Sequence, residues 1–164
     1  MKKLTPDFRA ILHTLLKHQV DFIVVGGVCG VLHGAPINTF DLDIVHSREP
    51  SNLDRLAKAL GALDARNRTP GRENLRASRS HLESSGHQLP MTEAGPLDLL
   101  GTIGKGHGYD DLASETIELD VGEGLKVCVL DLPALIRIKA ETAQEKDKAQ
   151  LTVLRRTLQE KSKS

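Results

Sequence analysis

The chain has 164 residues, the length of one compact domain, and its content of 39% apolar and 27% charged residues is that of a globular protein. Lysine plus arginine equal aspartate plus glutamate at 22 each, so no global positive field attracts nucleic acid. Three phenylalanines, one tyrosine and no tryptophan are too few for a platform that stacks single-stranded bases. No apolar run approaches the roughly 20 residues of a membrane span. With two distant cysteines, we expect reduced thiols and a cytoplasmic protein without membrane contact.

The pattern of apolar residues predicts an α/β (α+β) domain in which a small mixed β-sheet carries flanking helices. Thr5, Pro6 and Asp7 are expected to open the first helix as its cap, its first-turn proline and an acid near the positive end of the dipole. A similar opening at Asp131 predicts the last helical region. Helices are expected at residues 5–18, 28–33, 51–63 and 131–160, and strands at 21–25, 39–45, 88–92, 96–100, 116–121 and 125–130.

We interpret residues 1–164 as a single domain with a catalytic core at about 20–130 and a helical C-terminal region at about 131–160. Residues 65–87 show no periodicity and hold five arginines. This stretch is either a disordered loop or a patch that grips an acceptor such as RNA, and the sequence favours neither.

Two aspartates alternate on the expected second strand. Successive strand residues point to opposite faces, so Asp41 and Asp43 should share one face while Leu42 and Ile44 occupy the other. Two carboxylates this close repel each other unless a cation neutralises them, and oxygen ligands of this kind suit Mg²⁺ or Mn²⁺. The pair therefore predicts a divalent-metal site.

A glycine pair and a third aspartate complete the candidate site. Gly26 and Gly27 stand where a strand turns into a helix, where absent side chains let a phosphate approach backbone N–H groups. Asp98 lies on a short apolar strand, where a lone acid is costly unless it faces a ligand. Three carboxylates can hold two cations that polarise an α-phosphate and neutralise departing pyrophosphate. Asp41, Asp43 and Asp98 are therefore the expected metal ligands, with a nucleoside triphosphate as substrate.

These motifs resemble the DNA-polymerase-β-like nucleotidyltransferase superfamily, which combines a Gly-Gly at a strand end, an Asp-x-Asp strand and a later aspartate strand. Thirteen residues separate Gly27 from Asp41. The C-terminal pattern, an apolar helix with Lys139 followed by Lys146 and Asp147, is similar to the minimal bacterial nucleotidyltransferases of the AbiEii-type toxin family. The resemblance covers roughly residues 20–158.

The resemblance implies transfer of a nucleoside monophosphate to an acceptor hydroxyl by a toxin-type enzyme. Its acceptor would be a tRNA, a protein or a small molecule, and a cognate antitoxin would be its partner. It assigns catalytic roles to Asp41, Asp43, Asp98 and Lys139, and nucleotide contacts to Gly26, Gly27, Thr39, Lys139 and Asp147. Many relatives carry a basic residue just before the Asp-x-Asp, where this chain has Ile37, Asn38 and Thr39.

Two other functions remain open from the sequence. The segment from Asp41 to Val45 also resembles the nucleophile motif of haloacid-dehalogenase phosphohydrolases, in which Asp41 would be phosphorylated. Residues 37–40 are a weak lead-in for that motif, which normally ends a buried apolar strand. The chain could also be a catalytically silent nucleotidyltransferase-like binding protein, although keeping all three carboxylates argues against loss of catalysis.

Overall fold

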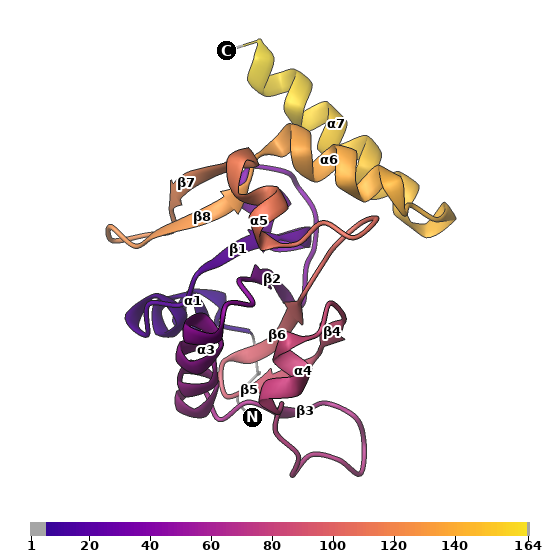
Figure 1. The fold of residues 1–164 in the computed structure, drawn as a ribbon. Helices are drawn as coiled ribbons and strands as arrows, with labels where there is room; N and C mark the ends of the chain where they lie inside the picture. Colours follow the sequence, from indigo (N-terminus) through magenta and orange to yellow (C-terminus); the bar gives the residue numbers. More distant parts are fainter. Residues whose placement is uncertain (1–5, 164) are drawn as a thin grey trace, which may run out of the picture.

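The computed structural model describes residues 6–163, in which eight strands form one mixed sheet (Figure 1). The strands are β1 (Phe22–Val25), β2 (Leu42–His46), β3 (Arg66–Asn67), β4 (His87–Gln88), β5 (Pro90–Thr92), β6 (Gly95–Leu100), β7 (Thr116–Asp120) and β8 (Lys126–Leu130). Their order is β3-β5-β6-β2-β1-β8-β7, and β4 also pairs with β6. The β2–β6 and β1–β8 pairs are parallel and the others antiparallel. The predicted mixed sheet with flanking helices is confirmed.

Helices flank the sheet in two groups. α1 and α3 lie side by side in the N-terminal half of the molecule, whereas α6 packs on α7 at the far end of the sheet and also contacts α2 (Figure 1). The helices are α1 (Phe8–Lys17), α2 (Gly26–Leu32), α3 (Pro50–Ala62), α4 (Arg79–Glu83), α5 (Tyr109–Leu112), α6 (Leu132–Glu141) and α7 (Lys148–Ser162), with 3-10 turns η1 (Ala113–Glu115) and η2 (Glu145–Asp147).

The paired central strands β2 and β6 carry aliphatic side chains at matching positions. Leu42 and Ile44 of β2 lie opposite Leu97 and Leu99 of β6, and all four are completely buried. Because side chains alternate, a slip of one residue would move this entire apolar set to the other face. The hydrophobic pattern therefore fixes the register of the β2–β6 pair.

Several boundaries differ from the sequence predictions. Helix α1 begins at Phe8, and the Asp7 carboxylate caps it by accepting a hydrogen bond from the Ala10 N–H at 3.0 Å. The predicted placement of Pro6 inside the first turn is therefore wrong, and Thr5 lies outside the described residues. Asp131 does cap α6 as predicted, accepting from the Ala134 N–H at 2.8 Å. Asp7 thus takes the capping position that the sequence analysis gave to Thr5, and its carboxylate satisfies an otherwise unpaired N–H group of the first turn.

Two further segments differ from expectation. Helix α2 begins at Gly26, two residues before the predicted start, and the strand expected from residue 39 begins only at Leu42. The segment at 65–87, which lacks periodicity, contains the short strand β3 and the short helix α4. Elements this short give no periodic signal, because a two-residue strand is defined by its partner alone.

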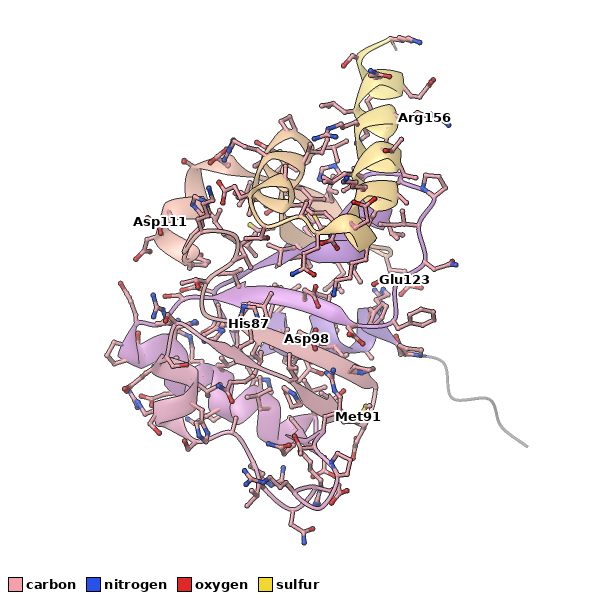
Figure 2. The ribbon with its side chains drawn as sticks, turned by 90° about the vertical axis from the view of Figure 1, so that its right-hand side faces the viewer. His87, Met91, Asp98, Asp111, Glu123 and Arg156 are labelled. Atoms are coloured by element: carbon pink, nitrogen blue, oxygen red, sulfur yellow. The ribbon has the colours of Figure 1, made fainter. Side chains whose placement is uncertain are left out.

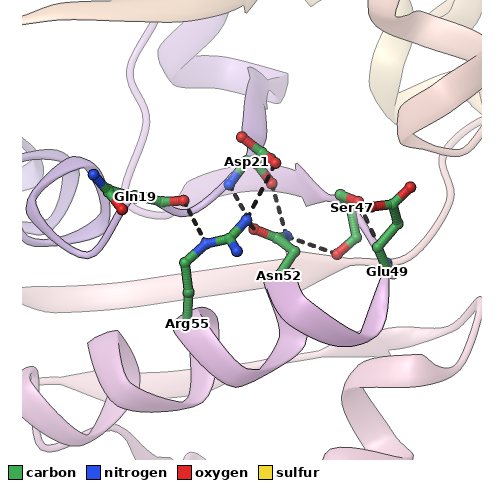
Figure 3. A network of polar contacts seen from close by, with 6 residues as sticks. All are labelled: Gln19, Asp21, Ser47, Glu49, Asn52 and Arg55. Carbon is green, nitrogen blue, oxygen red and sulfur yellow. Dashed lines mark hydrogen bonds and ion pairs between the residues drawn. The ribbon is translucent and has the colours of Figure 1, made fainter.

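A buried amide ties the start of α3 to the start of β1 (Figure 3). Asn52, only 1% exposed, accepts a hydrogen bond from the Asp21 N–H at 2.7 Å. Its Nδ2 donates to the carbonyl oxygens of Ser47 at 2.8 Å and Asp21 at 3.1 Å. Arg55 covers this network by donating to the Gln19 carbonyl at 2.8 Å. The network fixes the loop after β2 against β1, because each buried polar group has a partner.

Both cysteines are free thiols, with Cys29 buried in α2 and Cys128 exposed on β8. None of the helices formed by residues 6–163 has the length and apolar character needed to cross a bilayer.

Candidate active site

Asp43 and Asp98 lie directly opposite each other on the parallel strands β2 and β6. Both carboxylates point away from the aliphatic side of the pair and remain partly exposed. Figure 2 shows Asp98 near the middle of the sheet. The antiparallel register of β1 and β2 also places Asp43 opposite Val25, the last residue before α2. The two carboxylates and the glycine pair therefore meet at one end of β1.

The Asp43 carboxyl is the most perturbed acid of the site. Its Oδ1 atom is buried without a hydrogen-bond partner. Burial, a hydrogen bond with Asp98 and the charges of Asp98 and Asp41 raise the pKa of Asp43 to about 8, while the charge of Lys139 acts in the opposite direction. At neutral pH, without a cation, this carboxyl keeps its proton because its ionised form would face like charges in a poorly hydrated place.

Asp41 precedes β2 and does not lie on it. The Thr39 hydroxyl donates a hydrogen bond to the Asp41 carbonyl at 3.2 Å, which shapes the turn into the strand. The charge of Asp41 still reaches Asp43. The alternation predicts two acids on one strand, whereas the structure has Asp43 on β2 and Asp41 in the turn before it.

The two glycines allow close approach of side chains. Gly26 has φ +68°, in the left-handed region, and a Cβ there would overlap the Asp43 carboxylate, whose Cγ would lie 2.9 Å away. A Cβ on Gly27 would lie 2.7 Å from the Thr39 hydroxyl. Each glycine therefore makes room for a side chain of the site. The sequence analysis relates the two glycines to phosphate approach, and the structure adds the space for these two side chains as a further reason.

Lys139 reaches the same place from α6. A cavity of about 340 Å³ opens beside Asp43. The Lys139 ammonium lies 4.0 Å from Asp147 of η2, so these two residues, separated along the sequence, form an ion pair. The cavity is lined by Val25, Gly26, Asp43, His87, Leu100, Ile103, Gly104, Leu130, Leu135, Ile138, Lys139 and Thr142.

Arg68 is a site residue that sequence reasoning missed. Its Nη2 donates to Asp98 Oδ1 at 2.8 Å and to the Pro90 carbonyl at 2.9 Å. The Arg68 side chain is 29% exposed and the Asp98 side chain 15%. Arg68 belongs to the arginine-rich stretch, and nothing in the sequence distinguishes it from its neighbours. Only the pairing of β3 with β5 brings it next to β6.

The other arginines of that stretch mostly bind the protein itself. Arg66 and Arg76 both pair with Asp64, and Arg79 pairs with Asp54 and Glu83. These ion pairs tie the side chains of Arg66, Arg76 and Arg79 to acidic residues of the protein.

Two of the three expected carboxylates are placed where they could bind a divalent cation together. Among residues 6–163, no three His, Cys, Asp or Glu side chains already form a group that could hold a metal ion. Asp43 and Asp98 nevertheless lie opposite each other on β2 and β6, and the buried Asp43 Oδ1 has no hydrogen-bond partner. Oxygen atoms of carboxylates are the ligands that Mg²⁺ and Mn²⁺ prefer. A cation would compensate for the burial and the neighbouring carboxylates that raise the pKa of Asp43.

The fold also has a known counterpart. A crystal structure of a protein from Thermotoga maritima, described as a candidate nucleotidyltransferase, superposes with a TM-score of 0.58. The alignment covers 93% of this chain and 91% of the other, at 16% sequence identity. This chain has a nucleotidyltransferase-like fold. No protein-family model matches the sequence, and no curated protein matches it.

Proposed function

We propose that this protein is a metal-dependent nucleotidyltransferase that moves a nucleoside monophosphate from a nucleoside triphosphate to an acceptor hydroxyl. The observation that carries the proposal is the in-register pair of Asp43 and Asp98 beside Gly26, with Lys139 across the cavity. This arrangement supports the proposal because Asp43, paired with Asp98, lines a cavity together with Gly26 and the Lys139 ammonium. The fold shared with the Thermotoga maritima protein supports the same class of reaction.

Each residue has a role in this scheme. Asp43 and Asp98, with Asp41 at the edge, would hold Mg²⁺ or Mn²⁺, which when bound neutralises charge on the phosphates. The Lys139 ammonium would bind a phosphate oxygen, and Asp147 would keep that ammonium in place. Gly26 and Gly27 would let the triphosphate approach the backbone at the start of α2.

The finer assignments extend this proposal. On the resemblance to AbiEii-type enzymes, we propose a cytoplasmic toxin-type enzyme with a tRNA or protein acceptor and a cognate antitoxin. Thr39, which contacts both Gly27 and the turn to Asp41, would help to place the nucleotide. Incubation of the protein with each α-labelled nucleotide, Mg²⁺ and cell extract would reveal which molecule becomes labelled.

The phosphohydrolase alternative is less well supported. Its nucleophile would be Asp41, which precedes a strand here, whereas that motif ends one. Comparison of α- and γ-labelled nucleotide separates the two reactions. We expect pyrophosphate release with transfer of the α-label, lost in Asp43→Asn and kept in Asp110→Asn, an exposed aspartate of α5. Phosphate release with a hydroxylamine-sensitive label on Asp41 would refute the proposal, and nucleotide binding without any transfer would identify a silent binding protein.

A further inference from the structure

Arg68 and Asp98 form an ion pair beside Asp43 of the candidate site. The bond of 2.8 Å joins Arg68 Nη2 to Asp98 Oδ1, an oxygen of a carboxylate to which we assign metal binding. A guanidinium and a divalent cation satisfy the same need, since both neutralise a carboxylate that has lost most of its water. Arg68 therefore occupies one of the oxygens that a cation would use.

The ion pair is incompletely formed. Arginine usually binds a carboxylate through two parallel N–H groups, but here a single nitrogen, Nη2, serves both Asp98 and the Pro90 carbonyl. The Arg68 Nε is buried without a partner. A buried donor left unsatisfied is unfavourable, so this guanidinium has unused capacity for another anionic group.

The backbone that carries Arg68 is fixed. Asn67 pairs with Pro90 across β3 and β5, and its N–H donates to the Leu75 carbonyl at 2.8 Å. An ion pair of 2.7 Å between Arg76 and Asp64 joins the two ends of the segment that contains Arg68. Release of Asp98 by Arg68 therefore requires rotation of one side chain and no movement of the segment.

We propose that Arg68 is a built-in counter-cation of the metal site, which neutralises Asp98 when no metal is bound and leaves it when a divalent cation binds. The freed guanidinium is then available to a phosphate group of the nucleotide, through its Nη2 and through the Nε that has no partner. Arg68 thus positions Asp98 before metal arrives and sets the affinity with which metal enters. The inference rests on the proposed function, because it assigns Asp98 to the metal.

The test is Mn²⁺ binding measured by calorimetry and by the loss of the free-ion electron-spin signal. Wild type is compared with Arg68→Gln, which removes the charge, and with Arg68→Lys, which keeps it. Arg76→Gln is the matched control, because Arg76 belongs to the same segment but pairs with Asp64. We expect Arg68→Gln to bind Mn²⁺ about tenfold more tightly, Arg68→Lys to remain within about threefold of wild type, and Arg76→Gln to be unchanged.

A second measurement follows thermal unfolding with and without metal. In EDTA, Arg68→Gln should unfold at a lower temperature than wild type, because Asp98 loses its counter-cation. With saturating Mn²⁺ the difference should shrink. Unchanged or weaker Mn²⁺ affinity in Arg68→Gln would overturn the role of Arg68, provided that wild type binds Mn²⁺ and Asp43→Asn does not. If Asp43→Asn binds Mn²⁺ as wild type does, the metal site itself is wrong, and the proposed function and this inference fail together.

Discussion

Replacement of Asp43 by asparagine should make the metal-free protein less sensitive to alkali. Asp43 has a pKa raised to about 8 in the folded protein, mainly by burial and then by its hydrogen bond with Asp98. In the unfolded chain the same group titrates near its ordinary pKa of about 3.9. The folded state therefore binds the proton more tightly, so this contribution to stability is complete below pH 4 and disappears as the pH rises to 8.

The size of the effect follows from the same two values. Between pH 6 and pH 8 the unfolded chain has lost this proton while the folded protein still holds most of it. Well below pH 8 each pH unit lowers the unfolding free energy by about 1.4 kcal/mol, and this slope halves at pH 8, so the loss from pH 6 to pH 8 is about 2 kcal/mol. Asparagine keeps an N–H donor toward Asp98 and has no charge to acquire, so Asp43→Asn should not show this loss.

Urea unfolding in EDTA at pH 6 and pH 8 measures the difference. Wild type should lose about 2 kcal/mol more than Asp43→Asn between the two pH values. Asp110→Asn, at an exposed position of α5, serves as the control and should follow wild type. Equal losses in wild type and Asp43→Asn would refute the raised pKa. Addition of Mn²⁺ should reverse the trend for wild type, because the metal competes with the proton for the carboxylate.

Three further predictions concern neighbouring residues. Gly26→Ala should abolish Mn²⁺ binding, because its Cβ overlaps the Asp43 carboxylate, whereas Gly34→Ala, at φ +98° with no atom within 4 Å of the new Cβ, should cost only about 1 kcal/mol of stability. Lys139→Met should keep its Mn²⁺ affinity but bind a non-hydrolysable nucleoside triphosphate about tenfold more weakly, measured by fluorescence titration. Equal weakening in the control Lys148→Met would contradict a specific role for Lys139. Asn52→Ala should lower the unfolding free energy by about 3 kcal/mol, because it leaves buried backbone groups near β1 without partners, and urea unfolding would reveal a smaller loss if water replaces the amide.

The sequence was sufficient for the order of the main strands and helices. The apolar runs at β1, β2 and β6 and the cap at Asp131 follow from local patterns, because strand alternation and helix caps depend on neighbours in the chain. The structure brings the glycine pair and Asp43, which the sequence analysis singled out, together at one end of β1. Local patterns could not give the register of Asp43 against Asp98, since a parallel pairing is decided by distant residues.

The parts that were missed depend on tertiary contacts. Arg68 looks like its four neighbouring arginines, and only the β3–β5 pairing moves it to Asp98. Asp41 looked like a strand residue because it alternates with Asp43, but the turn stabilised by Thr39 occupies that position. The packing of Thr39 on Gly27 is likewise invisible in a sequence, because it joins a loop to a helix start.

The parallel pairing of β2 with β6 also has a consequence for synthesis of the protein. β1 and β2 are separated only by α2 and a short loop, so these two antiparallel strands can pair as soon as they leave the ribosome. The other edge of β2, which carries Asp43, remains unpaired until β6 has been synthesised. A nascent chain that ends before β6 should therefore have no affinity for divalent metal. Metal affinity would arise only after Asp98 has taken its place beside Asp43.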